Sequence, residues 1–484
     1  MSEMSIKVTE NDISAISLLN KEQKAAFNLI IEAVFVKSKG CFFVDGPGGT
    51  GKTFLYRALL AEVRSKGYIA LATASCGVAA AILPGDRTAH SRFKIPLDMN
   101  PNKMCKVSKQ SSLAKLLQRA KLIIWDEAPM THKAGIEGVD KLFRDLIDSS
   151  EIFGSKVIVF GGDFRQVLPI VIRGSKSDFV QSNLITSYIW PELQKIQLKE
   201  NMRAKSDPNF IEYLLRLGNG TEPVIYDENV EIPAKMLIRY TTEEESLTAL
   251  INIVYLDFSI FAGSNYSGIN RAILTTKNDF VDVINDTLIQ NFLGDSFDYI
   301  SRDTCLDPSQ QTILEDFINS LMPNGLPPHR LTLKQNTPIM LLRNIDPPEG
   351  LRNGTRLVCR SLKSNVIDAI ISSGEFSGKQ VFLHRICFSV EDDPNCPISF
   401  ERIQFPVRLC FAMTINKAQG QTLDFVGIYL REPVFSHGQL YVAISRAKNS
   451  NSVKILIRPP IHDITLDSLT ANIVYQEVLH LANA

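Results

Sequence analysis

The chain lacks three features that would each point to a definite class of protein. It has no run of eighteen apolar residues, so we expect neither a membrane span nor a membrane partner. Its eight cysteines are scattered and form no C-x-x-C pair, which argues against a disulfide framework and favours a reduced, intracellular compartment. Its net charge is zero, whereas a generic nucleic-acid binder carries an excess of basic residues.

Metal and targeting signals are also sparse. His384, Cys387 and Cys396 come closest to a metal cluster, but H-x-x-C with a distant cysteine is a weak pattern, and we expect no zinc there. Residues 1–12 contain three acidic residues and no arginine, so we expect neither a secretory signal nor a mitochondrial presequence. A length of 484 residues exceeds what one core normally supports, which predicts at least two domains.

The chain does contain a glycine-rich segment in a setting that suits phosphate binding. Eight consecutive residues fit the pattern G-x-x-x-x-G-K-[ST]: Gly46, Pro47, Gly48, Gly49, Thr50, Gly51, Lys52 and Thr53. A strand-like run at 41–44 precedes them, and apolar residues follow at helical spacing. In this setting backbone N–H groups approach phosphate oxygens, Lys52 reaches the terminal phosphates and Thr53 ligates Mg²⁺. The alternative is a glycine-rich turn with a chance Lys-Thr pair.

A second segment, an apolar run at 122–125, ends in two carboxylates, Asp126 and Glu127. At the end of its strand Asp126 would lie beside Thr53 and hold Mg²⁺. By strand alternation Glu127 would point the other way, where it could orient and deprotonate an attacking water. The alternative is an ordinary acidic helix N-cap. Behind a phosphate loop, the catalytic interpretation is favoured.

The order of predicted elements indicates an α/β protein with two parallel-sheet domains. Strand-like runs alternate with helical patterns in the first 200 residues, at 41–45, 69–73, 122–126 and 156–161. Similar strand-like runs return at 272–274, 426–430 and 453–457. The region between differs: it carries Pro-Pro, Asn353-Gly354 and Ser373-Gly374 turns between short strands at 339–342 and 381–383, which predicts a β-rich subdomain.

These patterns predict four parts. They are an N-terminal extension at 1–17, a first domain at 18–203, a second domain made of 204–280 and 411–484, and an insertion at 281–410. The first domain contains a basic segment at 85–121 with nine basic and two acidic residues, a net charge of 9 − 2 = +7. The acidic residues are Asp86 and Asp98, and the basic ones are Arg87, Arg92, Lys94, Lys103, Lys106, Lys109, Lys115, Arg119 and Lys121. Its charge fits equally a solvated surface insertion and a surface that follows a phosphate backbone.

Further motifs follow in a fixed order. They lie at 19–23 (Leu-Asn-Lys-Glu-Gln), 161–169 (Gly-Gly-Asp-Phe-Arg-Gln-Val-Leu-Pro), 198–203 (Leu-Lys-Glu-Asn-Met-Arg), 405–422 and 438–447. With Asp-Glu-Ala-Pro-Met at 126–130, this order resembles the superfamily-1 helicases. It resembles more closely the petite-integration-frequency (PIF) family of DNA helicases, including the helicase region of Helitron transposon proteins. The resemblance extends from about residue 18 to 460.

The resemblance implies two RecA-like ATPase domains, an SH3-like insertion, and ATP with Mg²⁺ as cofactors. It implies that Gln23 reads adenine and that Gln166 senses the γ-phosphate. It also implies that Arg203 and Arg446 act as arginine fingers across the cleft. Gly420 and Gln421 would line the same cleft. Five residues would contact the DNA strand: Thr88, His90, Arg92, Thr414 and Lys417. Because no phosphate-site residue lies in 281–410, we expect the insertion to be dispensable for ATP binding but required for unwinding.

The resemblance further implies a monomeric ATP-driven helicase that moves 5′-to-3′ on single-stranded DNA, unwinds tailed or forked duplexes and serves DNA repair or recombination. Residues 140–147 resemble the transposon-type version more, and no relaxase region accompanies the motifs, so we expect a helicase core only. We expect it in the nucleus, with an organelle as the open alternative. A catalytically inactive transposon remnant and a P-loop kinase are the competing functions, and stimulation of ATP hydrolysis by single-stranded DNA separates the three.

Overall fold

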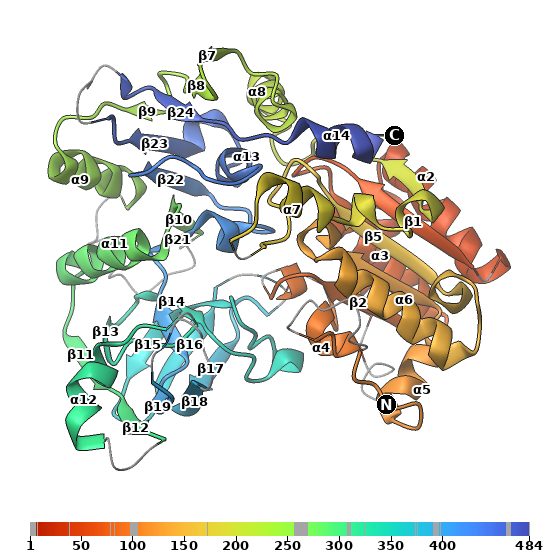
Figure 1. The fold of residues 1–484 in the computed structure, drawn as a ribbon, viewed down its shortest axis with the longest axis horizontal. Coiled ribbons are helices and arrows are strands. Elements are labelled where there is room, and N and C mark those ends of the chain that lie inside the picture. The colour runs from red at the N-terminus through yellow and green to blue at the C-terminus, as the bar shows by residue number, and fades with distance from the viewer. Residues whose placement is uncertain are drawn as a thin grey trace.

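The computed structural model describes residues 6–483 except 7, 38, 78, 82, 97–104, 172, 256–269, 307–310, 324, 373, 375, 391–395, 397 and 461–465. Figure 1 shows the first domain in red to yellow on one side, the second domain in green and blue on the other, and the insertion in cyan beside both. Within the residues described, every helix is too short or too polar to cross a membrane.

The first domain is built on a six-stranded parallel sheet. In spatial order its strands are β3 (Arg87–Thr88), β2 (Ala70–Ala74), β4 (Leu122–Asp126), β5 (Val157–Gly162), β1 (Gly40–Asp45) and β6 (Gln194–Gln197). Strands β2, β4 and β5 are buried along their whole length, because helices cover both faces of the sheet. The four strands predicted in this region are confirmed to within one residue at each end.

Two groups of helices cover that sheet. One face packs against α2 (Lys21–Glu32) and α3 (Lys52–Ser65), which begins directly after the glycine-rich loop. The other face packs against α5 (Ser112–Arg119) and α6 (Lys133–Ile147) around an aromatic cluster that includes Phe93 and Trp125. The loop therefore lies at the carboxyl end of a central strand, the usual ligand edge of such sheets.

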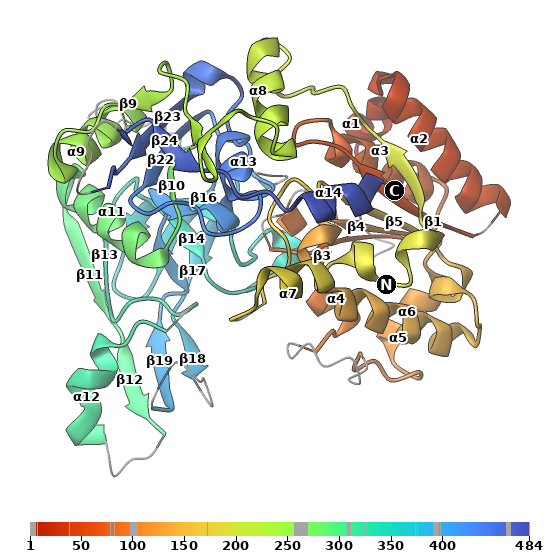
Figure 2. The same cartoon turned by 45° about the horizontal axis from the view of Figure 1, so that its top comes forward.

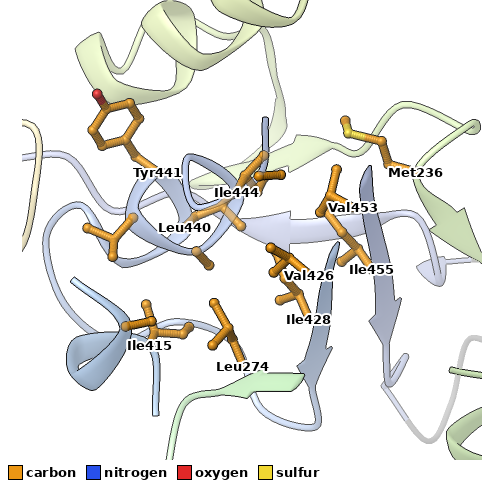
Figure 3. Packing of buried hydrophobic residues seen from close by; sticks show 14 of the residues in the cluster. Met236, Leu274, Ile415, Val426, Ile428, Leu440, Tyr441, Ile444, Val453 and Ile455 are labelled. Carbon is orange, nitrogen blue, oxygen red and sulfur yellow. The ribbon is translucent and has the colours of Figure 1, made fainter. Parts of the chain in front are cut away.

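The second domain has a five-stranded parallel sheet. Its strands are β21 (Ala412–Thr414), β10 (Arg271–Thr275), β22 (Phe425–Leu430), β23 (Val453–Ile457) and β9 (Leu237–Ile238). Figure 3 shows Leu440 and Ile444 of α13 (Gln439–Ile444) over Val426 and Ile428 of the sheet, with the Tyr441 hydroxyl turned away from the strands. Packing on one face of α13 thus directs its other face out of the domain.

The predicted start of the insertion at residue 281 is wrong. It falls inside α11 (Asn278–Asn291), whose Ile284 and Leu288 are fully buried in one core with Ile273 of β10 and with α9 (Glu243–Val254). A helix that covers the second sheet belongs to the second domain, so the insertion begins after α11.

The predicted end of the second domain at residue 484 is also wrong. The C-terminal helix α14 (Gln476–Asn483) packs Val478 and Leu479 into the core of the first domain. There the Trp190 indole N–H donates to the carbonyl oxygen of Leu481, at 3.3 Å. The chain therefore returns to the first domain at its end, and the two domains are tied together by a second crossing of the chain.

The insertion is antiparallel and β-rich, as predicted. Its main sheet has five strands: β17 (Gln380–Leu383), β16 (Ile367–Ile371), β15 (Arg356–Leu362), β14 (Pro338–Leu341) and β20 (Val407–Leu409). A separate arm of β12 (Arg302–Cys305), β19 (Phe400–Gln404), β18 (Ile386–Val390) and α12 (Gln311–Ser320) projects from it in Figure 2. The arm has its own small core, and a buried ion pair between Arg402 and Asp303 at 2.7 Å fastens two of its strands.

Candidate nucleotide and DNA site

A cavity of about 620 Å³ lies where the two parallel-sheet domains meet the insertion. The first domain contributes Gly48 to Phe54, Ala79, Asp126, Glu127, Gln166, Met202 and Arg203 to its wall. The second domain contributes Asn270, Gly420, Gln421, Thr422 and Arg446, and the insertion contributes Gly354, Thr355, Arg356 and Gly374. The volume suits a nucleotide, since ligand pockets usually span roughly 300–1,000 Å³.

The glycine-rich loop has a backbone that side chains would disrupt. Gly49 and Gly51 have φ of +99° and +79°, in the left-handed region. A Cβ on Gly51 would lie 2.4 Å from Nε2 of Gln23, and one on Gly49 would lie 2.7 Å from Oδ1 of Asn201. Lys52 is buried, and its ammonium donates to the Gly46 carbonyl oxygen at 2.5 Å. The loop thus presents the first turn of α3 and a lysine to the cavity, which is a site for phosphate groups.

Asp126 and Glu127 both line this cavity. Strand β4 ends at Asp126, and Glu127 has φ of +51°, in the left-handed region, so the alternation of side chains along the strand does not extend to Glu127. The N-cap alternative also fails. Glu127 precedes the short 3-10 helix Ala128–Met130, but its side chain makes no capping hydrogen bond.

The cavity wall fits a divalent cation. Burial and the neighbouring charge of Glu127 raise the pKa of Asp126 well above its ordinary value. Asp126 Oδ1 accepts a hydrogen bond from the backbone N–H of Glu127 at 2.9 Å, and the hydroxyl-bearing Thr53 lines the same cavity. A buried carboxylate beside a second one is stabilised by a cation, and oxygen donors are those that Mg²⁺ prefers. Thr53 and Asp126 therefore fit Mg²⁺.

Two arginines converge on the cavity from opposite domains. Arg203 Nη1 donates to the Ser445 carbonyl oxygen at 2.8 Å, and Arg446 Nη1 donates to that of Gln421 at 3.1 Å. Burial and the charge of Arg446 lower the pKa of Arg203 to about 9, and burial lowers the pKa of Arg446. Neither arginine has a carboxylate partner within 4.0 Å in the part of the chain that the structure describes. A buried cation and a partly buried one in this arrangement favour an anion between them.

The predicted glutamines differ in their access to the cavity. Gln166 lines it, and its Oε1 has no hydrogen-bond partner among the described residues, while its Nε2 donates to Asp163 Oδ2 at 3.3 Å. Gln23 contributes nothing to the lining: its Nε2 donates to the Thr50 carbonyl oxygen and its Oε1 accepts from the Asn20 N–H, both at 3.1 Å. An adenine contact from Gln23 stays a prediction and would require these bonds to exchange. Gly46 and Pro47 also contribute nothing to the lining.

Sequence reasoning missed three residues that complete this site. The Tyr441 hydroxyl crosses from the second domain, accepts a hydrogen bond from the Gly48 N–H at 3.0 Å and donates to Asp163 Oδ2 at 2.9 Å. Asn201 donates to the Gly48 carbonyl oxygen at 3.1 Å. Gln419 Nε2 donates to Glu127 Oε2 at 3.3 Å. All three lie inside the motif segments, and that position was the available signal.

None of the five residues predicted to contact DNA lines the nucleotide cavity. Thr88 caps the short helix α4 (Ala89–Phe93), and burial lowers the pKa of His90 on that helix, so His90 is neutral at neutral pH. Thr414 and Lys417 line a separate small pocket with Arg408. Burial and the charge of Arg408 lower the pKa of Lys417. Their contacts with DNA stay predictions.

Arg92 was predicted to contact DNA, but the structure buries it. Its side chain is only 2% exposed, and its Nη2 donates to the carbonyl oxygens of Ala72 and Gly85 at 3.0 and 2.7 Å. It stabilises the first domain from inside and adds no charge to the surface. Of the remaining basic residues in the segment, Lys103 lies outside the described residues, whereas Arg87 and Lys94 are exposed.

The insertion also reaches the nucleotide cavity, although no predicted phosphate-site residue lies in the insertion, and its being dispensable for ATP binding stays a prediction. The Asn353-Gly354 turn is present as predicted, with Gly354 at φ +89°. It packs so closely on the first domain that a Cβ on Gly77 would lie 2.2 Å from the Asn353 carbonyl oxygen. Because residues of this turn form part of the cavity wall, the insertion can affect nucleotide binding.

Comparison with known proteins agrees with this architecture. Residues 18–228 match the model of the PIF1-like helicase family, and residues 316–362 match the model of the 2B domain of the DNA helicase Pif1. The ATP-dependent DNA helicase PIF1 of Xenopus laevis is 26% identical over 448 residues, which are 90% of this chain and 61% of that protein. The chain thus spans about three fifths of the length of such curated relatives.

Solved structures show the same fold. The Pif1 helicase of Candida albicans has a TM-score of 0.67 at 22% identity, covering 96% of this chain and 99% of that chain. The Pif1 helicase of Bacteroides in complex with ADP-AlF3 and single-stranded DNA has a TM-score of 0.65 at 23% identity, covering 94% and 99%. The Helitron-like subtype stays a prediction. With its two RecA-like sheets, its β-rich insertion and both family matches, the chain belongs to the PIF1-like helicase family.

Proposed function

We propose that this chain is an ATP-dependent DNA helicase that translocates on single-stranded DNA and unwinds tailed or forked duplexes. The observation that carries the proposal is the composition of the nucleotide cavity, to which the phosphate loop comes from one RecA-like domain and Arg446, Gly420 and Gln421 come from the other. A site divided in this way closes only when the two domains approach. Binding and hydrolysis are thereby coupled to a relative motion of the domains.

Each group in the cavity supports one part of the reaction. Lys52 and the loop N–H groups bind the β- and γ-phosphates, and Thr53 and Asp126 hold Mg²⁺, which neutralises charge on the phosphate oxygens when bound. Glu127 takes the proton of the attacking water. Arg203 and Arg446 stabilise the charge that spreads over the transferred phosphoryl group, for which planar guanidinium groups are suited. The Oε1 of Gln166, which has no hydrogen-bond partner among the described residues, is available to the water or its neighbours.

The relatives support the choice of polymer. The Bacteroides protein of similar fold was crystallised with ADP-AlF3 and single-stranded DNA, and another Pif1 structure of similar fold, with a TM-score of 0.64 at 23% identity, concerns DNA unwinding at forked double-stranded DNA. By analogy we propose single-stranded DNA as the track. Movement 5′-to-3′, a monomeric motor and a nuclear location are proposed from the resemblance of the sequence motifs alone. The exposed Arg87 and Lys94 are our candidates for phosphate contacts on the first domain.

The test combines ATPase and strand-displacement assays. We expect ATP hydrolysis that depends on Mg²⁺ and is stimulated by single-stranded DNA, together with displacement of a strand from a duplex with a 5′ tail but not from one with only a 3′ tail. Glu127→Gln should keep nucleotide binding and abolish both activities. Nucleotide binding without turnover in the unmodified protein would favour an inactive remnant. ATP hydrolysis indifferent to DNA would exclude a helicase.

A further inference from the structure

Gln419 makes a direct contact across the domain interface with the proposed catalytic base. Its Nε2 lies 3.3 Å from Oε2 of Glu127, and the two side chains are buried, at 1% and 7% exposure. An ionised carboxylate only accepts hydrogen bonds, so the amide NH₂ is the group that faces it. Among the described residues this is the one hydrogen bond that the Glu127 carboxylate receives.

The backbone around Gln419 is held by the second domain. Gln419 follows the 3-10 helix Ile415–Ala418, and its N–H donates to the Asn416 carbonyl oxygen at 3.4 Å. The Asn416 side chain accepts from Gln439, the first residue of α13, at 3.2 Å. Gln439 in turn accepts from the Phe435 N–H at 3.0 Å. This relay of amides fixes Gln419 relative to the helix that carries Tyr441 and precedes Arg446.

Glu127 itself has little to hold it in the first domain. Its backbone is left-handed, its side chain makes no capping bond, and its N–H is engaged by Asp126. A glutamate side chain has three rotatable bonds, whereas a general base works only when its carboxylate is aimed at the water. A donor from the other domain supplies the missing constraint, and it does so only when the domains are together.

We infer that Gln419 is a positioning residue that orients the Glu127 carboxylate and makes hydrolysis depend on closure of the cleft. The inference rests on the proposed function. The Gln419 Oε1 is buried and has no partner among the described residues, which leaves the amide an acceptor for a hydrogen bond once nucleotide and water are bound.

The same segment offers a route from DNA to hydrolysis. Lys417, a predicted strand contact, stands two residues before Gln419, within the 3-10 helix Ile415–Ala418. Gly420, directly after Gln419, has φ of +82°, and a Cβ there would lie 3.6 Å from Ala79 of the first domain. A strand bound at Lys417 therefore constrains a turn that is already confined between the two domains, and this favours the Gln419–Glu127 contact.

The test uses Gln419→Met, which keeps the side-chain size and removes the donor. We expect kcat with saturating single-stranded DNA to fall on the order of 10- to 100-fold, with the apparent affinities for ATP and DNA unchanged within about twofold. Gln419→Ala is the second variant if the methionine variant is unstable. Gln476→Met, which removes an exposed amide bonded to Asn219, is the matched control and should leave every parameter unchanged.

A double-mutant cycle separates positioning from a structural role. Glu127→Asp withdraws the carboxylate by one methylene, so the donor at residue 419 no longer reaches it. Combined with Gln419→Met, it should be no slower than Glu127→Asp alone. Additive losses, or losses of ATP affinity and melting temperature without loss of kcat, would overturn the positioning role. A wild-type protein that lacks DNA-stimulated ATPase would overturn the proposed function and this role together, whereas an active wild type with an unimpaired Gln419→Met overturns this role alone.

Discussion

Replacing Arg203 by methionine should make the nucleotide-free protein more stable while making the ATPase slower. Burial and the charge of Arg446 lower the pKa of Arg203 to about 9. Measured against the ordinary arginine value, this corresponds to at most roughly 5 kcal/mol of disfavoured charge, at about 1.4 kcal/mol for each tenfold loss of proton affinity. Near neutral pH the side chain is still charged, because the solution lies below that pKa, and the full penalty is present.

One favourable contact opposes this penalty. The hydrogen bond from Arg203 Nη1 to the Ser445 carbonyl oxygen contributes roughly 1.5–3 kcal/mol, as is usual for a charged donor. The side chain is partly accessible, so solvent screens part of the repulsion. The balance leaves roughly 1–2 kcal/mol of net stabilisation when the charge is removed. An arginine that destabilises the empty site is expected where the bound state supplies an anion.

The assay is thermal unfolding with and without a non-hydrolysable ATP analogue, alongside kcat. We expect Arg203→Met to raise the melting temperature of the nucleotide-free protein by a few degrees and to lower kcat on the order of a hundredfold. The analogue should raise the melting temperature of this variant by less than it raises that of the wild type. Arg203→Lys is the control, because it keeps the charge and loses the planar fork. A nucleotide-free Arg203→Met protein that melts lower than wild type while retaining kcat would refute the reasoning.

Three further outcomes are expected. Because the pKa of Asp126 is raised, protons should compete with Mg²⁺, so the apparent Mg²⁺ affinity measured by ATPase titration should weaken as pH falls from about 8 to about 6; a constant affinity would contradict this. Changing Arg87 and Lys94 to glutamine should reduce the slope of log K against log salt for single-stranded DNA by roughly 0.7 each, whereas Lys66→Gln, at the far end of α3, should not. Arg92→Met should lower the melting temperature and leave that slope unchanged, since its guanidinium is buried; a flatter slope would return it to the DNA surface.

Local patterns were sufficient to predict the phosphate loop, four of the six strands of the first sheet and three of the five strands of the second. A buried parallel strand is an apolar run because both faces are covered, so β1, β4 and β5 were recognisable without any knowledge of their partners. The conformation of Gly51 follows from the same logic, because the loop needs a residue that tolerates positive φ. Residue types at short, fixed spacing carry this information, and tertiary contacts do not alter it.

The predictions failed where contacts between distant parts of the chain determine where a helix or a side chain lies. Periodicity cannot show that α14 leaves the second domain and packs beside Trp190 of the first, since its apolar face would suit either core. Arg92 was counted as surface charge because composition does not distinguish a solvated arginine from one whose guanidinium bonds to buried carbonyl groups. Strand alternation did not apply to Glu127, because the strand ends one residue earlier and Glu127 has a left-handed backbone.

Contacts between distant segments also bring the insertion into the wall of the nucleotide cavity. The Asn353-Gly354 turn forms part of the nucleotide cavity, and its neighbour Arg352 lies close enough to the buried Asp86 of the first domain to oppose the rise in that carboxylate's pKa, which burial causes. Arg352 is itself 4% exposed. A buried carboxylate whose charge is favoured by an arginine from another subdomain is destabilised when that subdomain moves away. Movement of the insertion would therefore weaken the Arg352–Asp86 interaction and also displace the Asn353-Gly354 turn, whose Gly354 forms part of the cavity wall.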